Sequence, residues 1–375
     1  MTFPLLSMLV RVVLVGTLLS PGVSQSTQKV TPPSDLLIAR QFAPIFYQAL
    51  GDKPHSDYIT NFDFDGDWRG DNNWNNSANK DFPLKAHIYY SIAETATHYF
   101  IHYAVFHPRD YKGGERKGAI LSELIREGAK RGGKYDPTGL ADEATLAHEN
   151  DMEGALVVVK KENNVLADAQ VIFVETLRHN SFAHYQTGDP VAGTQSIKLD
   201  GQQPVLYVEP KGHGIEAFTG EQKQVANKDF LKYVAGELAA DPDTVNATCR
   251  ISETTACQPV SYDLLPLTSL WAKAKANEKT TYGASFDYGE VKLSLKLPGS
   301  KQSEKTIKIG KAGCAFLGGV GGVNMARPPW GWFDRDQKER PLGQWFFDPA
   351  KTIKQDYKLE SGFQTTYIRL PFWAQ

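Results

Sequence analysis

The sequence has no excess of charge of either sign. Forty-one Lys and Arg residues against 43 Asp and Glu give a net charge of −2. That balance argues against a nucleic-acid-binding surface, which requires a basic patch. The sequence also has no internal repeat, no P-loop and no G-x-S-x-G motif, so neither of these catalytic motifs indicates its function. Beyond the N-terminus, no hydrophobic run reaches the length of a membrane span.

An apolar run at the N-terminus has the form of a signal peptide. It covers Val12–Leu19, ends before Pro21 and is followed by the small-residue stretch "GVS". Its short length and Pro21 argue against the alternative, a membrane anchor, and no cysteine follows it for lipid attachment. We therefore expect a signal peptide over 1–24, cleavage near Gln25, and a flexible leader over 25–36 in a secreted or periplasmic protein.

Cysteine is scarce, and two of the three cysteines lie close together. Cys249 and Cys257 occupy one polar segment, which is compatible with a local disulfide in an oxidising compartment. Cys314 lies in an apolar stretch, which favours a buried thiol. Pairings that involve Cys314 remain open at this point.

Most of the recognisable segments indicate strands. The segments "KAHIYYSIAE" and "THYFIHYAVFH", within 85–107, are rich in β-branched and aromatic residues around a short turn and predict a hairpin. The segments "GALVVVKK" and "ADAQVIFVET", within 154–176, predict a second strand pair. Further strands are predicted at 204–210, 286–299 and 305–310. Regular strands with turn signals predict a mainly β protein, a β-sandwich with added helices and long loops.

Two segments are expected to depart from this strand pattern. Residues 111–147 contain helical spacing in polar, glycine-rich surroundings and are interpreted as an insertion between two strands. The segment "NKDFLKYVAGELAA", at 227–240, is predicted to form a helix with Asn227 as its cap. We expect residues 37–375 to form a single β-sandwich domain that contains the insertion.

The hexapeptide "HENDME", at 148–153, places potential metal ligands directly before a predicted buried strand. Asp151 and Glu153 are two residues apart and can share one face of a strand, whereas His148 has an odd offset and requires a bend. Imidazole and carboxylates together suit a divalent cation of intermediate or hard character. A complete site needs a further ligand from elsewhere. The alternative is a solvated polar turn before the strand.

The pattern H-x-x-D-x-E before an apolar strand resembles the heptapeptide "GHRHDWE" of the necrosis- and ethylene-inducing-peptide-like (NLP) proteins. Upstream, "YAVFHPRD" at 103–110 is similar to that family's segment of the type "YSWYFPKD". The resemblance covers residues 85–160. It implies an NLP-like β-sandwich in which one divalent cation is held by Asp110, His148, Asp151 and Glu153.

The chain departs from the family pattern inside the heptapeptide. Asn150 stands where the family has its second His, and Met152 stands where it has Trp. The spacing from Asp110 to His148 is also longer, because the predicted insertion lies between them. Three carboxylates and one imidazole favour Ca²⁺ or Mg²⁺ over a softer ion, in a pocket that we expect to be open to solvent.

Two further groups of residues are candidates for ligand contacts. The loop at 61–80 carries Asp63, Asp65, Asp67 and Trp68; it does not match an EF-hand, and is either an irregular calcium site or a turn-rich surface loop. His213 and Glu216 lie in a glycine-flanked turn. That turn is either a second wall of the cation cavity or a hairpin turn with an exposed histidine.

Three functions are compatible with these features. The family resemblance implies a secreted, cytolysin-like protein that engages a membrane glycolipid or glycan with the help of a divalent cation and is not an enzyme. The alternative is a metal-dependent hydrolase of a sugar or phosphate ester, with Glu149 or His213 as the base. A third is a structural sandwich in which the cation only stabilises loops. We expect no nucleic-acid partner and no transmembrane segment in the mature protein.

Overall fold

The computed structural model describes residues 33–51, 53–110, 148–163, 165–220, 222, 229–245, 247–250, 257–320, 326–334, 342–357, 359 and 362–372. The predicted signal peptide with its cleavage point, most of the predicted leader and the predicted insertion at 111–147 lie outside the described residues. Residues 34–375 group into one compact unit, which is the subject of all that follows.

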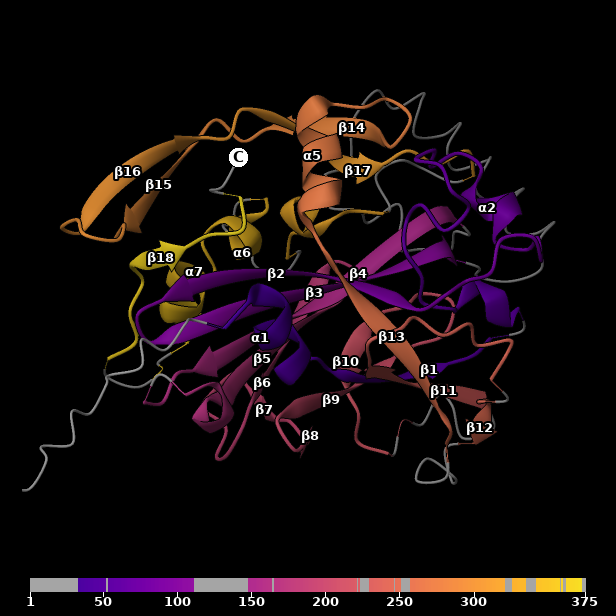
Figure 1. Cartoon of the computed structure of the whole chain (residues 1–375), viewed down its shortest axis with the longest axis horizontal. Coiled ribbons are helices and arrows are strands. Elements are labelled where there is room, and N and C mark those ends of the chain that lie inside the picture. Colours follow the sequence, from indigo (N-terminus) through magenta and orange to yellow (C-terminus); the bar gives the residue numbers. More distant parts are fainter. Residues whose placement is uncertain are drawn as a thin grey trace, which may run out of the picture. The chain divides into compact units, whose positions relative to one another are not determined.

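A mixed sheet of 16 strands, counted over the described residues, is the centre of this unit (Figure 1). Its main path has the order β10–β9–β1–β11–β13–β2–β3–β4–β5–β6–β7. Along that path the bounds are β10 Ile215–Ala217, β9 Gln203–Val208, β1 Ile45–Ala49, β11 Asp229–Ala235, β13 Pro259–Pro266, β2 His87–Thr95, β3 His98–Asp110, β4 His148–Lys160, β5 Gln170–Arg178, β6 Ser181–Gln186 and β7 Gln195–Ser196.

Shorter strands and a few helices complete the unit. Off the main path lie β8 Leu199–Asp200, β12 Cys249–Arg250, β15 Glu290–Leu295, β16 Ser303–Lys308 and β18 Tyr367–Arg369, and β14 Tyr282–Asp287 pairs separately with β17 Lys311–Phe316. The α-helices are α1 Asp35–Gln41, α2 Asn73–Asn76, α5 Thr268–Ala276, α6 Gln344–Phe347 and α7 Pro349–Asp356, with 3₁₀ turns at Pro54–Ser56, Leu166–Asp168 and Pro329–Gly331. The prediction of a mainly β protein with added helices and long loops is confirmed.

The longest strands, β3 and β4, pair antiparallel along their whole length. β2 pairs with the other edge of β3, and β5 with the other edge of β4. The two strand pairs predicted from the sequence are therefore real and are neighbours in one sheet. This pairing brings the end of β3 to the start of β4, and so determines where the predicted site residues meet.

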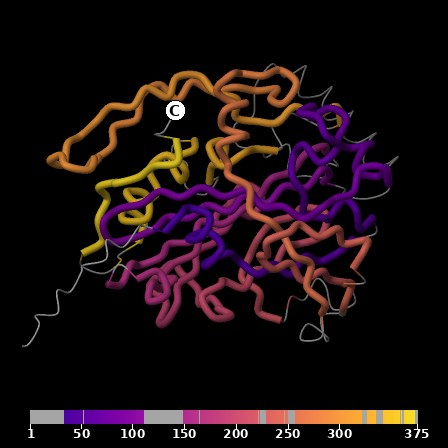
Figure 2. The backbone as a smooth tube through the Cα atoms, in the orientation of Figure 1, coloured from indigo at the N-terminus to yellow at the C-terminus, as the bar shows by residue number. Residues whose placement is uncertain are grey.

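Hydrophobic side chains cover both faces of these central strands. In β4, Ala155, Val157 and Val159 enter one core, whereas Leu156 and Val158 enter the other. This follows from strand geometry, because successive side chains point to opposite faces. Figure 2 shows the chain that builds the two cores: the β9–β10 region lies on one side of β2–β4, and the C-terminal part, orange to yellow, lies on the other.

The C-terminal side of the sheet is packed with aromatic rings. Trp330 and Trp332 are 0% and 3% exposed, as predicted for residues that pack over the sheet. Trp332 approaches β4 closely at Gly154, where an added Cβ would lie 2.4 Å from the indole ring and 2.3 Å from the Tyr103 carbonyl oxygen. A glycine is therefore required at 154 for this indole to rest on the strand.

The helix predicted at 227–240 is wrong for its described part. Residues 229–235 form β11, which pairs antiparallel with β1 and parallel with β13. Phe230, Leu231 and Tyr233 are buried there. The backbone groups of β1 and β13 need a neighbouring strand, and this tertiary requirement overrides the local preference for a helix.

Cys249 and Cys257 form a disulfide, and Cys314 is a buried free thiol. Both agree with the expectation from spacing and local polarity. Within the described ranges, no helix has the length and the apolar character needed to span a bilayer.

Candidate metal centre

The candidate site lies where β3 ends and β4 begins. Asp110, the last residue of β3, is paired with His148, the first residue of β4, and His107 is paired with Asp151. Strict alternation would place the side chains of His148 and Asp151 on opposite faces. Asn150 between them has φ 61°, outside the strand region. This distortion is the bend that the sequence predicted, and it allows both side chains to approach Asp110.

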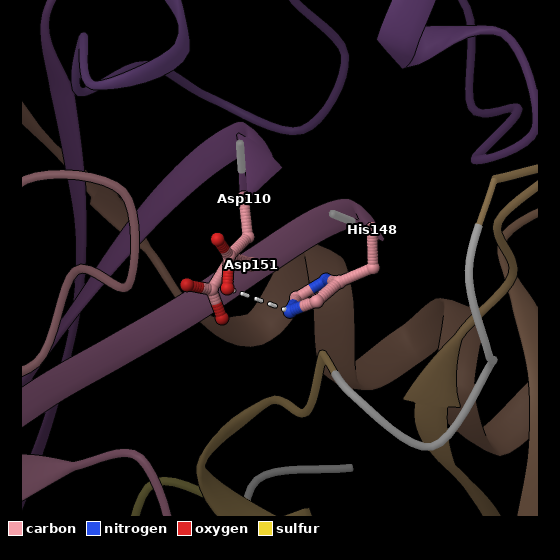
Figure 3. A group of neighbouring side chains, drawn as sticks. All are labelled: Asp110, His148 and Asp151. Carbon is pink, nitrogen blue, oxygen red and sulfur yellow. Dashed lines mark ion pairs between the residues drawn. The ribbon is translucent and has the colours of Figure 1, made fainter. Parts of the chain in front are cut away.

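Asp110, His148 and Asp151 converge on one point, as Figure 3 shows. One potential ligand atom from each residue lies within 4.8 Å of the others. Ligands of a shared Ca²⁺ ion lie about 2.4 Å from it, so two of them are at most about 5 Å apart. The three donors therefore fit a divalent cation. They are 2%, 6% and 4% exposed, so the predicted solvent-open pocket is wrong for these side chains.

The orientation of His148 supports this fit. Its Nδ1 lies 3.2 Å from the carbonyl oxygen of Asn150, and its Nε2 lies 3.1 Å from Asp110 Oδ2. In the neutral ring Nδ1 donates to the carbonyl, which turns the Nε2 lone pair toward the Asp110 carboxylate. A cation shared by Nε2 and the carboxylate stabilises such an arrangement, and a backbone carbonyl is a usual partner for the second nitrogen of a metal-binding histidine.

Asn150 joins three segments at this bend. Its side-chain nitrogen donates to the carbonyl oxygens of Gly70 (2.7 Å) and Leu317 (2.6 Å), and its side-chain oxygen accepts from Asn73 (2.6 Å). The residue is fully buried. Gly70 is needed for this approach, because an added Cβ would lie 2.2 Å from the Leu317 oxygen. The residue that replaces the family's second His thus anchors two loops to β4.

Glu153, the fourth predicted ligand, lies outside the group of three. It is buried in β4, and its Oε1 accepts a hydrogen bond from the backbone N–H of His179 at 3.1 Å. It shares a face with Asp151, as its spacing predicted, but one of its oxygens is used to hold the turn between β5 and β6.

Glu149 serves the backbone of two loops. Its Oε1 accepts from the N–H of Trp74 at 2.6 Å, and its Oε2 accepts from the N–H groups of Gly319 and Val320. Burial raises the pKa of Glu149, although the three N–H groups act in the opposite direction. Both oxygens are therefore engaged in holding the loops that surround the site.

We expect Glu149→Ala to destabilise the fold strongly. The substitution leaves three N–H groups without their acceptor, which corresponds to a loss of about 2–4 kcal/mol in the free energy of unfolding. Urea unfolding of the variant and the parent measures this loss. Glu216→Ala is the matched control, because Glu216 is partly exposed and pairs with Arg178 at 3.3 Å. Equal unfolding free energies for the two variants would contradict the assignment.

His213 is buried against the site and is not an exposed turn residue. Its Nδ1 lies 2.9 Å from Asp151 Oδ2, and its Nε2 lies 3.3 Å from Asp57 Oδ1. Burial lowers the pKa of His213, but the two carboxylates more than reverse this and raise it well above the usual range. Burial likewise raises the pKa of Asp151, and the histidines around it outweigh that and hold it low.

Sequence reasoning missed two residues of this environment, Asp57 and His107. The His107 ring stacks on that of His213, with 3.7 Å between the centroids and 5° between the planes. Neither residue belongs to a local motif, and Asp57 comes from a loop far from β4 in the sequence. His107 has a retrospective signal: it faces the same side of β3 as Val105, an inward position where a polar residue is unexpected.

The other candidate residues mostly make local contacts. In the loop at 61–80, the Asp63, Asp65 and Asp67 carboxylates accept hydrogen bonds from residues of the same loop: Asn61 for Asp63, Asp67 and Asn76 for Asp65, and Arg69 and Asn72 for Asp67. The Trp68 ring stacks on Phe62 at 5.9 Å, with the Lys273 ammonium 5.1 Å from its centroid. Only the metal-ligand group of three is brought together.

No protein-family profile matches the sequence, and no curated protein matches it. Among solved structures, the chain is similar to necrosis and ethylene inducing protein 2 from the causal agent of cocoa's witches' broom disease, with 15% identity over 50% of this chain and 70% of that chain and a TM-score of 0.28. It is similar to NLPPya in complex with mannosamine, with 14% identity, the same coverage and a TM-score of 0.29.

The chain is also similar to the non-toxic HaNLP3 protein, with 13% identity over 36% of this chain and a TM-score of 0.23. That match spans 46% of the HaNLP3 chain. The family that the sequence resembles is thus also the family of these structures. TM-scores below 0.3 describe a partial likeness, so the argument about function rests on this chain's own residues.

Proposed function

We propose that this chain is a secreted protein that binds a divalent cation, Ca²⁺ or Mg²⁺, and uses it to bind a glycan or the head group of a glycolipid at a cell surface. The observation that carries the proposal is the convergence of Asp110, His148 and Asp151. Two carboxylates and an imidazole supply the negative charge and the lone pairs that such an ion requires. Bound there, the cation would supply a positive centre for sugar or phosphate oxygens.

The surroundings of the site favour binding over hydrolysis. A hydrolase needs a base that can reach the substrate. Both oxygens of Glu149 accept backbone N–H groups. Both nitrogens of His213 face carboxylates in a fully buried position. The two residues suggested as bases are therefore engaged in structural contacts.

The proposal predicts sugar binding that depends on the cation. Two of the similar solved structures are complexes of NLPPya with glucosamine and with mannosamine, which makes these amino sugars suitable first probes. Purified protein should bind Ca²⁺ or Mg²⁺ in calorimetry. It should bind an amino sugar or a member of a glycan array with the ion present, and should lose that binding in a chelator.

Two controls separate the parts of this proposal. Restoring the ion after chelation should restore sugar binding, which excludes irreversible unfolding. Lipid vesicles with and without glycosylated head groups distinguish a glycolipid from a free glycan. A protein that takes up no divalent cation would contradict the metal site, and sugar binding that persists in chelator would assign the ion a structural role only.

A further inference from the structure

A chain of buried polar side chains extends from Asp151 away from the cation group. Asp151 Oδ2 contacts His213 Nδ1 at 2.9 Å, and His213 Nε2 lies 3.3 Å from Asp57 Oδ1. Asp57 and His213 are 1% and 0% exposed. Polar groups are buried at a cost unless they have partners, so this order of carboxylate, imidazole and carboxylate is a specified arrangement.

Asp57 is the fixed end of this chain. Its Oδ2 accepts from the N–H of Gly51 at 2.6 Å, and its Oδ1 accepts from the N–H of Lys211 at 2.7 Å. These two N–H groups come from separate segments. Lys211 and His213 both have positive φ, 72° and 55°, in the turn before β10. The Asp57 carboxylate therefore holds both the turn that carries His213 and the far nitrogen of its ring.

The faces of the His213 ring are also constrained. The parallel contact with His107 restricts tilting of the imidazole. His107 is in turn held through its Nε2, which lies 3.1 Å from Gln48 Oε1. With one face stacked and both nitrogens facing carboxylates, the ring has one orientation available. It engages one oxygen of Asp151, and a carboxylate has a second oxygen to offer a cation.

We propose that Asp57 is a positioning residue for the cation site: it orients His213, which fixes the carboxylate of Asp151 in the position from which it binds the ion. The inference rests on the proposed function, since it requires that Asp110, His148 and Asp151 hold a divalent cation. Asp57 itself does not touch the ion. Loss of a residue that supports a metal ligand lowers metal affinity by roughly 10–100-fold, and this is the effect expected here.

The test compares Asp57→Asn with the parent in calorimetric titrations with Ca²⁺ and Mg²⁺. Asparagine keeps the shape of the side chain and removes the charge that faces His213. The dissociation constant should rise roughly 10–100-fold. Asp243→Asn is the matched control: Asp243 also contacts a histidine, His55, at 2.8 Å, and that pair does not touch the cation group. The control should bind the ion as the parent does.

Melting curves recorded in chelator separate positioning from folding. Asp57→Asn should remain folded without the ion and bind it weakly, and the electron paramagnetic resonance spectrum of bound Mn²⁺ should change with the ligand geometry. If Asp57→Asn does not fold, His213→Gln replaces it and must show the same loss of affinity. Parent-like affinity in the folded variant overturns the role of Asp57 alone. A parent that binds no cation overturns the proposed function as well.

Discussion

Asp151→Asn is expected to abolish the stabilisation that a divalent cation gives to the parent protein. The substitution removes one of the two carboxylates in the group of three, and with it the acceptor charge that faces both the ion and His213. At a cation concentration about 100 times the dissociation constant, the parent should gain about 2.7 kcal/mol of unfolding free energy. The variant should gain almost none. Melting temperatures measured with and without Ca²⁺ or Mg²⁺ give the comparison directly.

The comparison must be made within each protein. Asp151→Asn also weakens the contact with buried His213, so the cation-free variant is expected to be less stable than the cation-free parent. Asp67→Asn is the control, because Asp67 hydrogen-bonds only within its own loop among the contacts described above. It should respond to the ion as the parent does. An equal response from Asp151→Asn and the parent would show that "HENDME" is a polar entrance to β4 and not a metal site.

Asn150→Ala is expected to cost about 3–4 kcal/mol of unfolding free energy. Alanine cannot accept from Asn73 or donate to the carbonyl oxygens of Gly70 and Leu317, and buried groups left without partners cost about 1–3 kcal/mol each. Alanine is also less tolerant than asparagine of φ 61°. Denaturant unfolding in chelator measures the loss without a contribution from the cation.

Asn150→Gly separates the two causes. Glycine adopts positive φ without strain, so this variant should lose the side-chain hydrogen bonds and keep the backbone bend. It should therefore be more stable than Asn150→Ala and less stable than the parent. Both variants should also bind the cation more weakly, because the bend brings His148 and Asp151 together. If both variants unfold within 1 kcal/mol of the parent, Asn150 does not anchor the loops.

The strands of the central sheet could be predicted because their information is local. The β-branched and aromatic residues of β2 and β3, and the apolar run of β4, match the side-chain alternation of a strand buried on both faces. Short turns then make β2–β3 and β4–β5 neighbours. β11 shows the limit of this reasoning. Its apolar residues also fit helical spacing, and only the strands on either side of it decide the matter.

The candidate site divides in the same way. The residue types and spacing of His148 and Asp151, together with the resemblance that adds Asp110, predicted three side chains that the structure brings together. The odd offset of His148 predicted a bend. Glu153 was placed on the correct face, but its hydrogen bond to the His179 backbone depends on a turn that no pattern within β4 reveals.

The sequence by itself determined the strand character of the core and the chemistry at the junction of β3 and β4, because both depend on residues close together in the chain. Only the tertiary structure decided which distant residues support that chemistry. Asp57, His213 and Gln48 reach Asp151 from segments that meet β4 after the sheet has formed. Buried polar groups must find partners wherever the fold places them, and the identity of those partners is therefore a property of the packed molecule.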